Sequence, residues 1–159
     1  APSAEPAGAA ETAQLRAGAG VVPAVHPSGV AGLRVLVVDD EPDARELVQA
    51  MLELGGVTVR SAANAADAYA LLREWRPDAL VSDIGMPGTD GYQFMRMVRA
   101  LPDDEGGRTP AVAATAFARG EDRTKALLSG YQAHLAKPVD ANELVAIVAT
   151  LAGRTGRGA

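Results

Sequence analysis

Acidic, hydroxyl and amino side chains end or directly follow four short apolar segments of the chain: Asp39, Asp40, Asp83, Thr115 and Lys137. Carboxylates that share a pocket repel one another, which raises at least one pKa. A divalent cation removes that conflict, and Mg²⁺ takes oxygen ligands and favours phosphate oxygens. An ammonium and a hydroxyl would stabilise charge on a phosphoryl group, and a carboxylate can be the nucleophile. If these groups converge, they predict phosphoryl transfer to a carboxylate.

The apolar segments have the length and composition of buried β-strands. The run at residues 33–38 is β-branched at three positions, which is typical of a strand that is covered on both faces. The predicted strands are residues 33–38, 57–62, 79–83, 110–115 and 133–136.

Helices are predicted between these strands, because residues typical of helix N-termini and C-termini bound the segments that connect them. Pro42 suits the first turn of a helix that Gly55 and Gly56 end. The later helices are predicted at 64–75 with Asn64 as N-cap, 91–101, 120–129, and from a cap at Asp140 to Leu151, with a loop at 103–109.

Strands that alternate with helices predict an α/β fold, a doubly wound parallel sheet with helices on both faces in a three-layer sandwich. Sites in such folds form outside the carboxyl ends of the strands, at a switch in strand order. The polar residues of the first paragraph all stand at predicted carboxyl ends. We therefore expect them to converge at one edge of the sheet.

Composition limits the classes of protein that fit. Residues 1–32 are rich in Ala, Pro and Gly and are predicted to be a flexible linker or tail, residues 33–152 one domain, and residues 153–159 a small disordered tail. The net charge of −5 argues against nucleic-acid binding, and the absence of Cys excludes thiol chemistry. No segment approaches the ~20 apolar residues of a membrane span.

Four motifs resemble those of response-regulator receiver domains of two-component signalling. They are Val37-Val38-Asp39-Asp40-Glu41-Pro42, the segment from Asp83 to Gly91, Thr115-Ala116 and Lys137-Pro138. The resemblance covers about residues 33–152. It implies a flavodoxin-like sheet with strand order 2-1-3-4-5.

The resemblance also implies a role for each motif residue. Asp83 would be the phosphoacceptor. Asp40 and Asp83 would bind Mg²⁺ (or Mn²⁺) directly, with Asp39 acting largely through water and the Gly85 carbonyl as a further ligand. Lys137 would contact the phosphoryl group, and the switch residue Thr115 would move toward it.

Three further positions tune the switch and the reaction rates in this family. His134 stands where the family usually has an aromatic switch residue, and we expect it to report the state of Thr115. Gly85 offers no side chain to position a hydrolytic water, and Phe117 could shield the acyl phosphate. The sequence therefore predicts a long-lived phosphoryl group.

The family implies a donor that is a histidine kinase or a histidine phosphotransfer protein, and a cytoplasmic location, free or tethered to a membrane-bound kinase. We interpret the chain as the receiver module of a hybrid histidine kinase. The receiver itself is not expected to be an independent enzyme, because it catalyses only its own aspartyl phosphorylation and dephosphorylation. The alternatives are a stand-alone response regulator and a binding module that is not phosphorylated. An aspartyl phosphohydrolase is disfavoured because Gly85 stands where a second acid is needed, and a dinucleotide-binding enzyme because no G-x-G-x-x-G follows the first strand.

Overall fold

The computed structural model describes residues 30–116 and 120–154. Strands and helices alternate along the chain as predicted. The strands are β1 (Arg34–Val38), β2 (Thr58–Ala62), β3 (Ala79–Asp83), β4 (Ala111–Thr115) and β5 (Ala133–Ala136). The helices are α1 (Pro42–Leu54), α2 (Ala65–Trp75), α3 (Gly91–Arg99), the 3₁₀ helix η3 (Asp103–Glu105), α4 (Gly120–Ser129) and α5 (Ala141–Arg154).

The described strands form one parallel sheet in the order β2-β1-β3-β4-β5, which confirms the predicted topology. The order reverses between β1 and β3, so the switch point lies beside the end of β1. In the register of the sheet, Asp83 pairs with Ala114 and Thr115 pairs with Ala136. The polar residues that end these strands therefore lie at the same edge.

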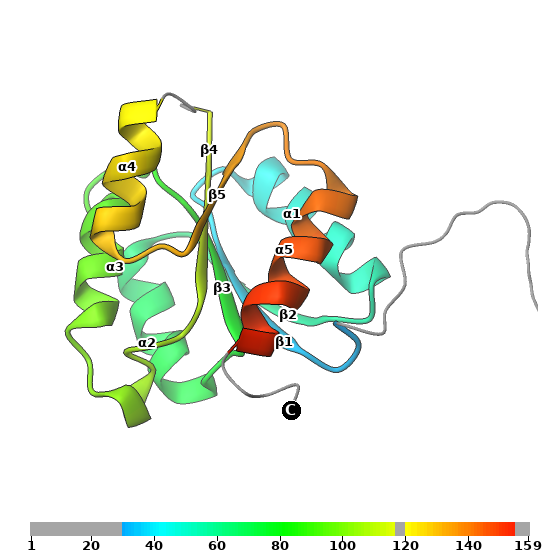
Figure 1. Ribbon diagram of the computed structural model, residues 1–159, viewed down its shortest axis with the longest axis horizontal. Coiled ribbons are helices and arrows are strands. Elements are labelled where there is room, and N and C mark those ends of the chain that lie inside the picture. The colour runs from blue at the N-terminus through cyan, green and yellow to red at the C-terminus, as the bar shows by residue number, and fades with distance from the viewer. Residues whose placement is uncertain (1–29, 117–119, 155–159) are drawn as a thin grey trace, which may run out of the picture.

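Helices cover both faces of the sheet in three layers (Figure 1). Helices α1 and α5 lie on one face, and α2, α3 and α4 lie on the other. Successive residues of β1 alternate between the two apolar cores: Val35 and Val37 pack beneath α1 and α5, whereas Leu36 and Val38 pack beneath α2 and α3. This two-sided burial explains why β1 is apolar on both faces after Arg34, its partly exposed first residue.

Side chains at the N-termini fix where several helices begin. Asn64 accepts from the N–H of Asp67, as predicted, and Asp140 accepts from the N–H of Glu143. At α3, Asp90 forms a capping box with Gln93, which sequence reasoning did not single out. The Asp90 cap is important for the site because α3 begins at the end of the loop that leaves Asp83.

The strands β1, β2 and β4 begin one residue later than predicted, and three other boundaries differ by two residues or more. Helix α3 ends at Arg99 rather than Leu101, because Pro102 disfavours helical geometry at the residue before it. Helix α5 continues to Arg154, beyond the predicted end of the domain at residue 152. Val30, which was expected in the linker, is only 1% exposed and packs in the core beneath α1 and α5.

The single tryptophan marks the amino ends of the strands. Two guanidinium groups lie over the Trp75 ring, with Arg34 at 5.4 Å and Arg60 at 5.0 Å from its centroid. Arg34 also donates to the Trp75 carbonyl at 2.7 Å. Because Arg34 begins β1, this cluster lies at the opposite edge of the sheet from Asp39.

Within residues 30–116 and 120–154, no helix is both long enough and apolar enough to cross a bilayer.

Candidate functional site

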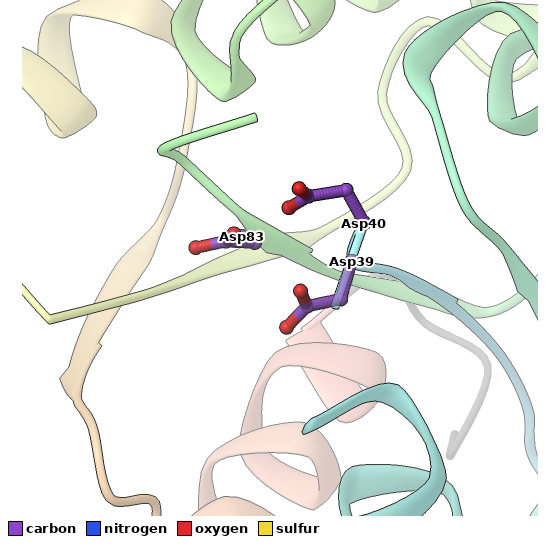
Figure 2. Close-up of side chains that lie close together, drawn as sticks. All are labelled: Asp39, Asp40 and Asp83. Atoms are coloured by element: carbon purple, nitrogen blue, oxygen red, sulfur yellow. The ribbon is translucent and has the colours of Figure 1, made fainter. Parts of the chain in front are cut away.

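Three carboxylates meet at the carboxyl edge of the sheet. Asp39 and Asp40 follow β1, Asp83 ends β3, and one oxygen from each lies within 4.8 Å of the others. Figure 2 shows the three side chains extending in the same direction from the two strand ends. Asp39 and Asp83 are buried at 3% and 9% exposure, whereas Asp40 is exposed. The cluster is therefore open to solvent on the side of Asp40.

Lys137 brings a positive charge to the buried part of this cluster. Its ammonium nitrogen lies 2.9 Å from Asp39 Oδ2 and 3.3 Å from Asp83 Oδ1. Lys137 follows β5, so this contact joins residues from the first, third and fifth strands. Because Lys137 is largely shielded from water, its charge acts strongly on both carboxylates.

The pKa of Asp83 is raised above its ordinary value of 3.8, and burial is the largest cause. The charge of Lys137 opposes this shift, the charge of Asp39 adds to it, and a hydrogen bond from the Gly85 backbone also opposes it. Burial alone would lower the pKa of Lys137, but its hydrogen bond to Asp39 and the charge of Asp83 raise it overall. A charged Lys137 therefore stands between two carboxylates that repel each other.

Thr115 lies next to Lys137 at the end of β4. It is 1% exposed, and its backbone carbonyl accepts a 2.9 Å hydrogen bond from the Lys137 N–H. The backbone therefore holds these two residues side by side. The structure thus brings together Asp39, Asp40, Asp83, Thr115 and Lys137, the set expected from the sequence.

The comparisons with known proteins agree with this geometry. The family model of the response regulator receiver domain matches residues 35–149. This chain belongs to the response regulator receiver family.

Relatives in sequence and structure support the assignment. The receiver is 48% identical over 119 residues to an uncharacterized 14.6 kDa protein of Leptolyngbya boryana, a match that covers 75% of this chain and 89% of that protein. It is 43% identical over 123 residues to response regulator Rre1 of Synechocystis, covering 77% of this chain and about half, 52%, of that protein. The receiver domain of a sensor histidine kinase from Pseudomonas aeruginosa, solved with a magnesium ion coordinated in its active-site cleft, superposes with a TM-score of 0.70 at 35% identity, covering 77% of this chain and 99% of that one.

Receiver domains bind Mg²⁺ at an acidic pocket, and the donor set of this receiver fits that ion. The cluster offers three carboxylates, the hard oxygen ligands that Mg²⁺ requires. One of the three, Asp40, is exposed, so an ion bound there would keep contact with water. Mg²⁺ retains several waters in protein sites, which suits a cluster that is open to solvent on the side of Asp40.

The loop after Asp83 is compact and leaves Gly85 open to solvent. The N–H of Met86 donates to the Ile84 carbonyl at 2.9 Å, and Gly88 adopts a positive φ of 79° that favours glycine. A Cβ added at Gly85 would meet no atom of the described residues within 4 Å. Gly85 therefore lies beside free space next to the carboxylates.

Two expected tuning residues have different outcomes. His134 is half-buried in β5 and pairs with Ala113, two positions before Thr115 along β4. His134 therefore lies near Thr115, and its role in the switch stays a prediction. Phe117 lies outside the described residues.

The structure adds two features that sequence reasoning missed. The Lys137–Pro138 peptide bond is cis. The hydroxyl of buried Tyr131 donates to the carbonyl of Gly91 at 2.9 Å, directly behind the loop of Asp83. A tyrosine beside Gly130 in sequence gives no signal of such a contact, because the contact joins residues 40 positions apart.

Proposed function

We propose that Asp83 accepts a phosphoryl group from the phosphohistidine of a histidine kinase or a histidine phosphotransfer protein. The observation that carries this proposal is the convergence of Asp83, Asp39 and Asp40 within 4.8 Å, with Lys137 3.3 Å from the Asp83 carboxylate. Three carboxylates thus lie together with only one ammonium, which contacts Asp39 and Asp83. Such an excess of negative charge suits a divalent cation, which in turn binds phosphate oxygens.

The chain's own residues account for the steps of the transfer. An Asp83 carboxylate oxygen attacks phosphorus, a P–O bond forms, and the P–N bond to the donor imidazole breaks. Lys137 stabilises the phosphoryl oxygens during transfer. Asp39, Asp40, Asp83 and the Gly85 carbonyl would hold Mg²⁺ or Mn²⁺. When bound, the ion neutralises charge that develops on the phosphoryl oxygens.

The phosphoryl group would then shift the domain between two conformations. We propose that Thr115 moves toward the new oxygens and that His134 follows it, since the two residues lie on the neighbouring strands β4 and β5. If His134→Ala leaves the phosphorylation-induced change in amide NMR shifts intact, His134 has no part in the switch.

Intact mass after incubation with acetyl phosphate and Mg²⁺ tests the acceptor. The wild type is expected to gain one phosphoryl adduct, which EDTA prevents and Asp83→Asn abolishes. Asp43→Asn is the matched control, because Asp43 is an exposed acid in the first turn of α1, outside the cluster. Absence of an adduct in the wild type would instead support a binding module that works without phosphorylation.

Two arrangements of the whole protein have a counterpart among the relatives. The match to the receiver of a sensor histidine kinase supports a module of a hybrid kinase, and the match over most of the 14.6 kDa protein supports a stand-alone regulator. We propose a cytoplasmic location for the domain in both arrangements, with tethering to a membrane-bound kinase in the first. An immunoblot of the native protein separates them: a mass near the 16.3 kDa of this chain indicates the stand-alone form, and a several-fold larger mass the kinase.

A further inference from the structure

Tyr131 joins the turn between α4 and β5 to the loop of the phosphoacceptor. Its ring is buried at 2% exposure, and its hydroxyl donates to the Gly91 carbonyl at 2.9 Å. Gly91 is the first residue of α3, and its own N–H donates to the carbonyl of Ile84 at 2.8 Å. Tyr131 therefore contacts the residue that closes the loop beginning at Asp83.

The backbone of Gly91 is closely packed on the side that faces Asp83, Ile84 and the Tyr131 hydroxyl. A Cβ at Gly91 would lie 2.5 Å from the Asp83 carbonyl oxygen, 2.6 Å from Ile84 Cα and 3.0 Å from the Tyr131 hydroxyl. The Ser82 hydroxyl, which donates to the same Asp83 carbonyl at 2.9 Å, also lies beside the phenol. Gly91 is thus packed closely between the backbone of Asp83 and Ile84 and the Tyr131 hydroxyl, so a displacement of that backbone would press on the tyrosine.

Other contacts fix the same turn to α3, so a movement of the loop reaches α4. The Arg99 guanidinium near the end of α3 donates to the Gly130 carbonyl at 3.0 and 2.8 Å. Toward the start of α3, the Lys125 ammonium of α4 lies 4.5 Å from the centroid of the Tyr92 ring. Helices α3 and α4 are therefore linked along their length, and Tyr131 supplies the link nearest to Asp83.

We propose that Tyr131 is a positioning residue that couples the backbone of the Asp83 loop to α4 and β5, separately from the Thr115 side of the site. The inference rests on the proposed phosphorylation of Asp83. A hydrogen bond in a dry environment is strong and is costly to leave unmade, so the Gly91 carbonyl and the phenol move together. A change in the loop at Asp83 then reaches the C-terminal end of α4, and this route does not include His134.

Amide NMR with Mg²⁺ and beryllofluoride, a phosphoryl mimic, tests the coupling in Tyr131→Phe, which keeps the ring and removes the hydroxyl. In the wild type, we expect shift changes both in residues 83–91 and in residues 126–132. In Tyr131→Phe, we expect the changes in 83–91 to persist and those in 126–132 to fall at least about twofold. Tyr69→Phe is the matched control, because Tyr69 lies half-buried on α2 away from the site, and it should behave as wild type.

Each outcome separates the inference from the proposed function. If residues 126–132 of Tyr131→Phe show the same shift changes as the wild type, the coupling is wrong. Tyr131 then only stabilises the fold. The absence of any shift change and of any adduct in the wild type overturns the phosphorylation of Asp83 instead.

A second measurement does not depend on the folding of the variant. The wild type labelled with 3-fluorotyrosine carries three fluorine probes, assigned through Tyr69→Phe and Tyr92→Phe. Beryllofluoride should move the Tyr131 resonance and leave that of Tyr69 in place. An unmoved Tyr131 resonance contradicts the coupling.

Discussion

The ammonium of Lys137 donates a 2.9 Å hydrogen bond to Asp39 Oδ2, although the two residues are 98 positions apart in the sequence. The contact joins the end of β1 to the end of β5, across β3, which carries Asp83, and β4, which carries Thr115. The charge of Lys137 is thereby shared between two buried carboxylates. Removal of any member of this group changes the electrostatic balance of the other two.

Lys137→Met should destabilise the metal-free domain at neutral pH, because Asp39 and Asp83 would face each other without a counter-ion. We expect a loss of about 1–3 kcal/mol in the free energy of unfolding, less than for a fully buried pair since Lys137 is partly exposed. Urea denaturation in EDTA and in Mg²⁺ measures it, and Mg²⁺ should recover much of the loss. A loss that is the same in EDTA and in Mg²⁺ would show that the effect is not electrostatic.

Asp40→Asn should weaken Mg²⁺ binding without unfolding the domain. Asp40 is exposed, so the free energy of unfolding without metal should change by less than about 0.5 kcal/mol. Loss of a charged oxygen ligand should lower Mg²⁺ affinity by about tenfold or more. Isothermal titration calorimetry reports the affinity, with Asp43→Asn as control. Unchanged affinity in Asp40→Asn would remove Asp40 from the ligand set.

Gly91→Ala and Gly85→Ala should behave in opposite ways. A Cβ at Gly91 would overlap backbone atoms of Asp83 and Ile84, so we expect a loss of about 2–4 kcal/mol in stability and slower phosphorylation. A Cβ at Gly85 meets open space and should cost less than about 0.5 kcal/mol. Thermal unfolding and adduct formation measure both effects. Similar stability of the two variants would contradict the close packing at Gly91.

Tyr131→Phe should have a pH-dependent effect on stability. Burial raises the pKa of Tyr131 above its ordinary value of 10.0. At neutral pH the phenol is un-ionised in both states, and loss of its hydrogen bond should cost about 1–2 kcal/mol. Above pH 10 the unfolded chain ionises first and the wild type loses stability. The gap between wild type and variant should therefore narrow in urea denaturation series at rising pH, and a constant gap would contradict the burial of the phenol.

The phosphorylated form should decay slowly, because Gly85 beside the carboxylates has no side chain to orient a water. Gly85→Asn introduces an amide into the open space there and should shorten the half-life several-fold. Mass spectrometry after removal of acetyl phosphate follows the decay, with Gly85→Ala as the control for bulk alone. Rapid decay of the wild type, or equal half-lives in all three, would remove Gly85 as a determinant.

The parallel α/β architecture and the convergence of the site could be predicted from short-range patterns in the sequence, whereas the strand order was predicted from the family resemblance of the motifs. The apolar runs identify the strands, and parallel packing brings Asp39, Asp83 and Lys137 to one edge. The start of the folded domain was less predictable, because tertiary packing decides it. Val30 is buried because it packs against the helices of its face, which its Gly-rich neighbours do not reveal.

Contacts between distant elements could not be predicted. The hydrogen bond of Tyr131 to Gly91 and the guanidinium contacts of Arg99 depend on how α4 and β5 pack against α3. A tyrosine or an arginine in an amphipathic segment has the same sequence pattern whether its polar atoms reach solvent or a buried carbonyl. Pairwise geometry of this kind is set only after the layers have formed.

The contacts of Trp75 with Arg34 and Arg60 bear on what intrinsic fluorescence can report. The indole lies at the amino edge of the sheet, and the carboxylates lie at the carboxyl edge. Its emission is sensitive to the two nearby guanidinium groups, which come from β1 and β2 while the ring comes from α2. We therefore expect tryptophan emission to follow the separation of these elements on unfolding and to change little when a metal or a phosphoryl group binds at the opposite edge.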